Sequence, residues 1–172
     1  MKRNATIPPA LANLKGTPCG MFLSNEIQMA DIIDIVLEQI GPSSLYQTSF
    51  SISEEFLRRL YFIKEKGLLK HTSLLLDHKA TLKTARIWNF CQNVFDEAFL
   101  TANHSKVLLF AADSGDVVSV ISSQNLTRGN RMEAYSISTD PNLFSSLYEG
   151  YSKLLSNSIP LNEIFAGRFN KD

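Results

Sequence analysis

The stretch Asn103-His104-Ser105-Lys106-Val107-Leu108-Leu109-Phe110-Ala111 opens the part of the sequence that decides the fold. It is followed by Asp113-Ser114-Gly115-Asp116 and then by Val117-Val118-Ser119-Val120-Ile121. Two apolar runs of strand length therefore flank a segment whose residues favour a tight turn. We predict a β-hairpin here, and a further strand at 134–138.

The sequence before the hairpin alternates between helical and strand patterns. The expected helices are 25–40, 53–66 and 80–93, with a last helix that opens at Asp140-Pro141 after the hairpin. The other expected strands are 44–50, 72–76 and 95–100. Strands that alternate with helices and then give way to a hairpin predict one α/β domain, a mixed β-sheet flanked by helices on both faces.

The composition is that of an ordinary globular protein. Of the 172 residues 44% are hydrophobic and 20% are charged, which excludes disordered, collagen-like and coiled-coil proteins. Residues 1–24 contain several prolines and glycines, so we expect an extended N-terminal arm before a single domain over 25–172. Cys19 and Cys91 are too few for a disulfide framework, and two free thiols in a reducing compartment are the simplest expectation.

Charge and hydropathy limit the partners of the chain. Lys and Arg number 17 and so do Asp and Glu, so binding to a polyanion would need a local positive surface. Pro8 and Pro9 interrupt the N-terminal stretch, so no signal peptide is expected. No apolar run approaches the about 20 residues of a membrane span. We expect a soluble, cytoplasmic protein that does not bind membranes.

Polar side chains gather where the hairpin begins and ends. His104 and Lys106 are two residues apart at the entry to the first strand, so both side chains point to the same face. Antiparallel pairing returns the chain to this entry at Ser123, and Asn125 follows in a loop. Glu133 opens the next strand. All five side chains are therefore expected at one edge of the sheet.

This set of groups suits chemistry at phosphorus. An imidazole can attack phosphorus or deliver a proton near neutral pH, and an ammonium, an amide and a hydroxyl can bind the non-bridging oxygens. A carboxylate bonded to the second ring nitrogen would fix the tautomer. A His-x-Lys at the start of a strand is usually only a solvated edge, so the interpretation rests on the whole set. No second His or Cys lies at ligand spacing from His104, and we expect no metal and no other cofactor.

His104-Ser105-Lys106 and Ser122-Ser123-Gln124-Asn125 together resemble the signature of the phospholipase D superfamily of phosphodiesterases and nucleases. That signature is His-x-Lys-x-x-x-x-Asp and, later, Gly/Ser-Ser-x-Asn, and Glu133 is similar to the downstream carboxylate of the family. The resemblance covers most of the chain from about residue 25 and implies a phospholipase D-like fold. One position departs from it, because Ala111 stands where the family has Asp.

The resemblance implies how a chain with a single copy of the motif would act. Such chains pair as homodimers, with His104 of each subunit facing the other across a two-fold axis. One His104 would form a phosphohistidine, and the other would protonate the leaving oxygen and then activate water. Lys106 and Asn125 would hold the phosphate oxygens, Ser123 would assist, and Glu133 would orient His104.

Single-copy members of the family are often nucleases, so nucleic acid, DNA in the first place, or another phosphodiester is the expected partner. Five basic residues could contact its phosphates without reading its sequence. They are Lys79, Lys83 and Arg86, expected on one helix face, and Arg128 and Arg131, which follow Asn125. Each group could equally be an ordinary solvated basic surface.

Two functions from different classes stay open. The first is a metal-independent phosphodiesterase, in the first place a nuclease, and the intact set of His104, Lys106, Asn125 and Glu133 favours it. The second is a catalytically silent dimeric module that binds nucleic acid or another phosphate ligand in the same pocket, and Ala111 favours it. A lipid-processing phospholipase is a weaker third, because no amphipathic basic helix for membrane binding stands out.

Overall fold

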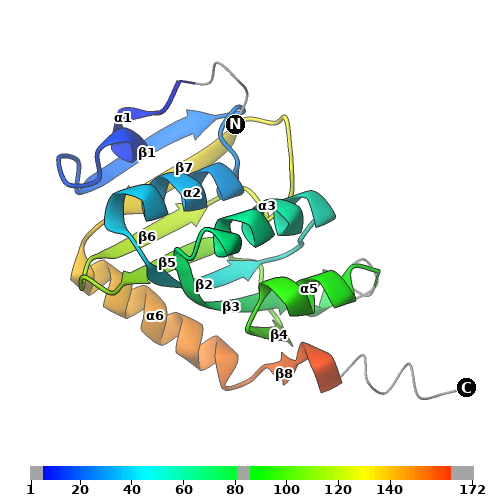
Figure 1. The fold of residues 1–172 in the computed structure, drawn as a ribbon. Coiled ribbons are helices and arrows are strands. Elements are labelled where there is room, and N and C mark those ends of the chain that lie inside the picture. Colours follow the sequence, from blue (N-terminus) through cyan, green and yellow to red (C-terminus); the bar gives the residue numbers. More distant parts are fainter. Residues whose placement is uncertain (1–5, 81–85, 164–172) are drawn as a thin grey trace, which may run out of the picture.

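A mixed β-sheet organises the chain in the computed structural model, which describes residues 6–80 and 86–163 (Figure 1). The strands are β1 (Cys19–Ser24), β2 (Ser43–Ser49), β3 (Leu69–Asp77), β4 (Glu97–Thr101), β5 (Val107–Ala112), β6 (Val117–Ser122), β7 (Glu133–Ser138) and β8 (Ile159–Pro160). The helices are α1 (Pro9–Ala12), α2 (Met29–Ile40), α3 (Glu54–Glu65), α5 (Trp88–Val94) and α6 (Pro141–Leu155), with a 3₁₀ turn η1 (His78–Ala80).

The strand order is β1-β7-β6-β5-β2-β3-β4-β8. β2, β3 and β4 run parallel to one another, because α3 and α5 carry the chain back between them. β5 pairs antiparallel with β2 and forms the expected hairpin with β6. The sequence-based prediction of a mixed sheet in an α/β domain is confirmed.

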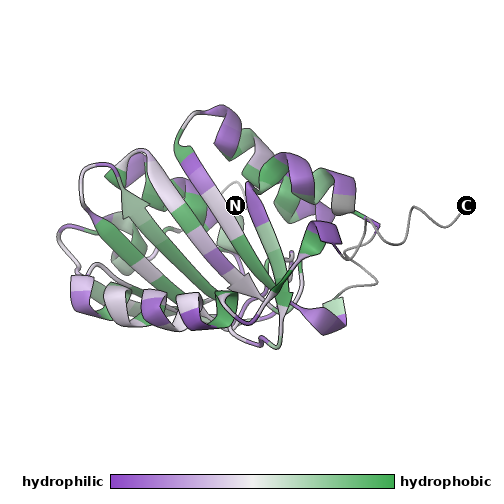
Figure 2. Ribbon diagram, turned by 90° about the horizontal axis from the view of Figure 1, so that it is seen from below, coloured by the Kyte–Doolittle hydropathy of each residue, from purple (hydrophilic) through white to green (hydrophobic). Residues whose placement is uncertain are grey.

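Helices cover both faces of the sheet, as predicted. α2, α3 and α5 lie on one face and α6 lies on the other (Figure 1). Hydrophobic residues concentrate along the strands, and the helices alternate between hydrophobic and hydrophilic residues (Figure 2). No helix within the described ranges is long and apolar enough to cross a membrane.

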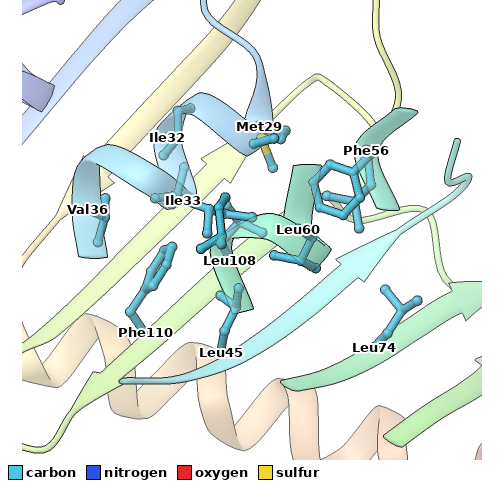
Figure 3. Close-up of a cluster of buried hydrophobic side chains, with 14 of the residues drawn as sticks. Met29, Ile32, Ile33, Val36, Leu45, Phe56, Leu60, Leu74, Leu108 and Phe110 are labelled. Atoms are coloured by element: carbon cyan, nitrogen blue, oxygen red, sulfur yellow. The ribbon is translucent and has the colours of Figure 1, made fainter. Parts of the chain in front are cut away.

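The larger hydrophobic core fills the space between the sheet and the helices α2 and α3 (Figure 3). Its labelled members are Met29, Ile32, Ile33, Val36, Leu45, Phe56, Leu60, Leu74, Leu108 and Phe110. Cys91 belongs to the same core, and burial raises the pKa of its thiol to about 12. Cys19 is exposed, and both cysteines are free thiols.

The N-terminal segment departs from the expected arm. Residues 19–24 form the edge strand β1, which pairs antiparallel with β7 from Cys19↔Ser138 to Ser24↔Glu133. Phe22 stacks on Tyr135 with the ring centroids 4.9 Å apart, so β1 adds to the core on one face. A boundary after residue 24 would therefore divide this sheet, and β1 belongs with the domain.

The helix expected over 80–93 is not continuous, because residues 86 and 87 form a turn, and 81–85 lie outside the described residues. Within the described residues η1 covers 78–80, and α5 begins only at Trp88. Oδ1 of Asp77 accepts the N–H of Lys79 at 2.8 Å, which favours a tight turn at the end of β3. Lys79 and Arg86 therefore do not share the face of one helix, and Lys83 lies outside the described residues.

A partly buried ion pair joins α2 to α3. Arg59 donates to Oδ1 of Asp31 at 2.6 Å, and the side chain of Asp31 is 3% exposed. Oδ2 of Asp31 also accepts the N–H of Gln28 and closes a capping box at the start of α2. Burial alone would raise the pKa of Asp31, but the hydrogen bonds from Arg59 and the backbone outweigh it and lower the pKa.

We expect Arg59→Met to destabilise the protein by about 2–3 kcal/mol at pH 7, because it removes a hydrogen-bonded cation from a buried carboxylate. Urea unfolding measures this difference. The pKa of Asp31 is lowered in the folded state, so the pair stabilises above the ordinary pKa of 3.8 and is lost as pH falls through the lowered value. The deficit of the variant should therefore shrink below about pH 4.

Arg58→Met is the matched control. Arg58 pairs with Glu54 one turn away, but the two side chains are 66% and 52% exposed, so its loss should cost at most about 0.5 kcal/mol. If both variants lost the same free energy of unfolding, or if the loss in Arg59→Met did not change with pH, the buried pair would not be the source of the stability.

Candidate active site

The expected site residues lie at one edge of the sheet, where strands of opposite direction meet. β2 ends at Ser49, and β5 begins beside it because Thr48 pairs with Val107. The end of β6 joins the same edge, since the N–H of Ser122 donates to the carbonyl of Lys106 at 2.9 Å. β7 begins there with Glu133, the partner of the last residue of β1.

His104 and Lys106 contact each other directly. Nζ of Lys106 lies 3.2 Å from Nδ1 of His104 and donates to the carbonyl oxygen of His104 at 2.6 Å. Lys106 is buried, His104 is exposed, and the imidazole lies 5.1 Å from the ring of Phe50. A charged Lys106 donates to Nδ1, so the proton of a neutral ring is on Nε2. Nε2 is then the ring atom left for a ligand.

Burial lowers the pKa of Lys106, and the negative charge of Glu133 opposes this shift without cancelling it. The ammonium is thus poorly hydrated inside the protein and has lost part of the solvation that a surface lysine keeps. An anion at this edge would restore favourable interactions to it. This is the electrostatic condition for a phosphate-binding lysine.

The loop that presents His104 is held by hydrogen bonds of its neighbours. Asn103 donates its N–H to Oδ2 of Asp77 at 3.1 Å and accepts the N–H of Ser105 on Oδ1 at 3.0 Å. The Ser105 hydroxyl donates to Oγ1 of Thr48 at 2.8 Å. Asp77, Asn103 and Thr48 were not predicted as supports of this loop, although their positions at strand ends were a usable signal.

A second set of bonds holds the loop of Asn125. The Ser49 hydroxyl donates to Oδ1 of Asn125 at 3.3 Å and accepts the N–H of Leu126 at 3.1 Å. Gln124 is buried, and its Oε1 accepts from the N–H of Met29 and the hydroxyl of Tyr135 at 3.0 Å and 2.9 Å. The loop between β6 and β7 is therefore fixed to β2, α2 and β7. Nothing in the sequence pattern marked Gln124 for this role.

Glu133 was expected to orient His104, but its hydrogen-bond partner in the structure is Ser123. Its carboxylate accepts the Ser123 hydroxyl, and Oγ of Ser123 in turn accepts the N–H of Ala134 at 3.0 Å. Between the described side chains of Glu133 and His104 there is no hydrogen bond. In this structure Glu133 acts on the site through Ser123 and through the pKa of Lys106.

Four of the five basic residues lie in connections that leave this edge. Lys79 and Arg86 fall between β3 and α5, and Arg128 and Arg131 fall between β6 and β7; all four are exposed. Arg128 donates to Oε1 of Glu55 at 3.0 Å. Within the described ranges Lys79, Arg86 and Arg131 make no ion pair, so their charges are available to a ligand.

Ala111 lies at the far end of the strand from the site. It pairs with Ser44 and Val117 next to the hairpin turn, five residues beyond Lys106. At the rise of an antiparallel strand this is roughly 17 Å from Lys106. A carboxylate here could not contact a phosphate beside His104, so the departure from the signature removes no group from the site.

The described part of the chain holds no cluster of three or more His, Cys, Asp or Glu side chains arranged for a metal ion. The side chains at the edge are an imidazole, an ammonium, hydroxyls, an amide and one carboxylate. They can bind an anion and exchange a proton with it.

Comparison with known proteins bears on the fold. No family model matches the sequence, and no curated protein matches it. Nuc, a phospholipase D family member from Salmonella typhimurium, superposes with a TM-score of 0.63 over 83% of this chain and 96% of its own, at 16% identity. NucT from Helicobacter pylori gives 0.60 over 83% and 98%, at 15% identity.

TrmBL2, an archaeal chromatin protein described with a novel mode of DNA binding, gives a TM-score of 0.56 over 85% of this chain and 55% of its own, at 12% identity. These identities are low, so the likeness concerns the path of the chain. Because Nuc and NucT are matched over nearly their whole length, this chain has the fold of the phospholipase D superfamily.

Proposed function

We propose that the protein is a metal-independent phosphodiesterase, in the first place a nuclease, that works as a homodimer through a phosphohistidine. The observation that carries the proposal is the contact between His104 and the buried Lys106 at an exposed edge, 3.2 Å from Nδ1 to Nζ. A phosphate bound by Lys106 would lie against the imidazole. The hydroxyl of Ser123 and the amide of Asn125 border the same position from the end of β6.

Two imidazoles are needed for the reaction. Nε2 of one His104 attacks phosphorus, which forms a P–N bond and breaks the P–O bond to the leaving group. The second ring is an imidazolium: it gives its Nε2 proton to the leaving oxygen and becomes neutral, then takes a proton from the water that cleaves the P–N bond. A second copy of the chain supplies the second ring. In the attacking copy the proton moves to Nδ1, where Glu133 would replace Lys106 as the partner of the ring.

An exposed apolar strip beside the site is the surface we assign to the dimer. It consists of Met21 and Leu23 of β1, Ile121 of β6 and Met132 before β7, which are 77%, 69%, 41% and 61% exposed. Met21 and Ile121 both pair with Ser136, so they lie on one face of the sheet. Apolar side chains gathered like this usually mark an interaction site.

Along the strands, the strip extends to the edge of the sheet that carries the site. Ile121 pairs with Val107, the residue after Lys106, and Leu23 precedes the partner of Glu133. A two-fold contact through the strip uses the same residues on both copies and would bring the two edges together. We therefore assign this face to a second copy of the chain.

Nucleic acid is the favoured substrate because the exposed basic residues Lys79, Arg86 and Arg131 lie in connections that leave this edge. A few phosphate contacts suffice for binding without sequence preference.

The silent, DNA-binding alternative is favoured by the likeness of the fold to TrmBL2. The position of Ala111 far from the site argues against loss of activity.

We expect His104→Ala to lower cleavage of single-stranded DNA by at least about 10³-fold in the presence of excess chelator, because both chemical roles are lost. Release of fragments measures the rate. His71→Ala is the matched control, since His71 lies near the start of β3 and contacts Glu97. The remaining histidine, His78, directly follows β3, and His78→Ala is a second control. Wild-type protein that binds DNA without cleaving it would instead establish the silent module.

We expect Leu23→Lys to convert a dimer into a monomer and to abolish cleavage, because a charge in the apolar strip opposes its burial. Light scattering with size-exclusion chromatography measures the mass. Phe62→Lys on α3 is the control, since Phe62 is 66% exposed but lies outside the strip. An active wild-type monomer would contradict the two-histidine mechanism, and a dimeric Leu23→Lys variant would contradict this interface.

We expect Glu133→Gln to move the loss of phosphodiester binding to lower pH. Binding needs the charged form of Lys106; Glu133 raises the pKa of Lys106, so removing its charge lowers that pKa further and the cation is lost earlier as pH rises. Titration with diethyl phosphate, whose own charge is constant, measures the midpoint. Glu149→Gln on α6 should leave it unchanged. An upward shift would show that Glu133 does not act through Lys106.

A further inference from the structure

Gln47 carries a polar side chain inside the larger hydrophobic core. It is fully buried in β2 and pairs with Leu74 of β3 on one side and Leu108 of β5 on the other. Both leucines belong to the core under α2 and α3 (Figure 3). Among the described residues neither Nε2 nor Oε1 of Gln47 has a hydrogen-bond partner. Burial of an amide without partners is unfavourable, so Gln47 is a position where a hydrogen bond can still be gained.

Lys106 lies on the same face of the sheet, one step closer to the edge that carries the site. Leu108, the partner of Gln47, comes two residues after Lys106, so the three side chains share a face. The backbone of Lys106 continues the pairing of the strands, since its carbonyl accepts the N–H of Ser122. Lys106 is therefore the diagonal neighbour of Gln47 across β2 and β5. Cβ atoms of diagonal neighbours are about 7–8 Å apart, which long side chains can bridge.

Ser49 stands closer to Lys106 on β2, but its oxygen is already in use. Oγ of Ser49 accepts the N–H of Leu126 at 3.1 Å and the N–H of Ser51 at 3.3 Å. Of the two polar side chains that β2 places beside Lys106 on this face, Gln47 is thus the one whose oxygen has no donor among the described residues.

The proposed reaction requires Lys106 to change one of its partners. An ammonium has three N–H donors, and in this structure Nζ of Lys106 contacts the carbonyl oxygen and Nδ1 of His104. During the reaction Nδ1 carries a proton in both copies, in the attacking ring and in the imidazolium that acts as the acid. A protonated Nδ1 cannot accept a hydrogen bond. Because Lys106 is buried, the N–H that is released needs another acceptor.

We propose that Gln47 is a positioning residue for Lys106, and that its Oε1 accepts an N–H of the ammonium when Nδ1 of His104 becomes protonated. The inference rests on the proposed function and adds a residue to it. No covalent bond changes in this exchange, and Lys106 keeps its charge and its contact with the phosphate. Gln47 touches neither the substrate nor the reacting atoms, and it acts through Lys106.

Gln47→Met tests the exchange by kinetics, because methionine keeps the length of the side chain and removes the amide. The exchange takes place in the substrate complex, so we expect kcat for single-stranded DNA to fall on the order of 10-fold with KM unchanged, the effect of one hydrogen bond to a charged group. The melting temperature should not fall, since the amide that is removed has no partner among the described residues. An unchanged kcat would overturn the proposal.

Ser119→Ala is the matched control for this variant. The hydroxyl of Ser119 is also buried and has no hydrogen-bond partner among the described residues. Ser119 pairs with Leu109 of the smaller core beneath α6, on the opposite face from Lys106. Its removal should leave both kcat and KM unchanged. An equal fall of kcat in Ser119→Ala would show that the effect of Gln47→Met is not specific to Lys106.

NMR of glutamine side chains labelled with ¹³C at Cδ tests the exchange without turnover. When His104 takes up a proton as the pH is lowered, the Gln47 signal should move in step with the signals of the His104 ring. Gln39 is the internal control, because its amide already bonds to the backbone of Leu11. His104→Ala should abolish the movement, although it retains Glu133, the other titratable group that acts on Lys106.

The two measurements separate this inference from the proposed function. A Gln47 signal that does not follow His104 would overturn the exchange, even in a protein that cleaves DNA. A signal that follows His104 in a protein that cleaves no DNA would uphold the exchange and reject the phosphodiesterase. Cleavage by the wild-type protein with an equal kcat in Gln47→Met would reject the role of Gln47 and leave the proposed function intact.

Discussion

The antiparallel pairing of β5 with β2 is the constraint on which the candidate site depends. β2, β3 and β4 run parallel, so their carboxyl ends and the polar residues that follow them share one edge. Because β5 runs the opposite way, its first residues meet that edge as well, and the hairpin returns the end of β6 to it. Loops from both kinds of strand can therefore surround one small ligand.

Burial of Lys106 gives this edge its chemical character. An exposed lysine would be fully hydrated and would gain little from one more anion, whereas Lys106 has given up part of its water and contacts the carbonyl and the ring of His104. Desolvation lowers the pKa of Lys106, so the site is less stable when empty than when it holds a negative charge. The surrounding hydrogen bonds of Asn103 and Gln124 keep the loops in place despite this cost.

Local patterns predicted much of the fold, and long-range contacts account for what they missed. The hairpin was foreseen because its turn and both strands are adjacent in sequence. β1 was not, because its six residues include Gly20 and its partner β7 follows more than 100 positions later. The signature residues His104, Lys106, Ser123, Asn125 and Glu133 were found at one edge, but the bond of Glu133 to Ser123 depends on rotamers that no sequence pattern encodes.

The variable positions of the signature also have structural roles that the sequence pattern does not predict. Ser105 and Gln124 occupy the places where the signature accepts any residue. Yet the hydroxyl of Ser105 bonds to Thr48, and the buried amide of Gln124 joins the Asn125 loop to α2 and β7. Their roles depend on the particular neighbours in this chain, so a family signature cannot include them.

The two faces of the sheet are packed to different degrees. The face under α2 and α3 carries the larger core, and this core fixes the register of the strands. The other face has a smaller core around Leu75, Leu109 and Tyr151 beneath α6, and beyond α6 it leaves Met21, Leu23 and Ile121 exposed. The strip that we assign to the second copy is on this second face. A fold that obtains its stability on one side can leave the other side incompletely packed, and that side is where a partner can still add contacts.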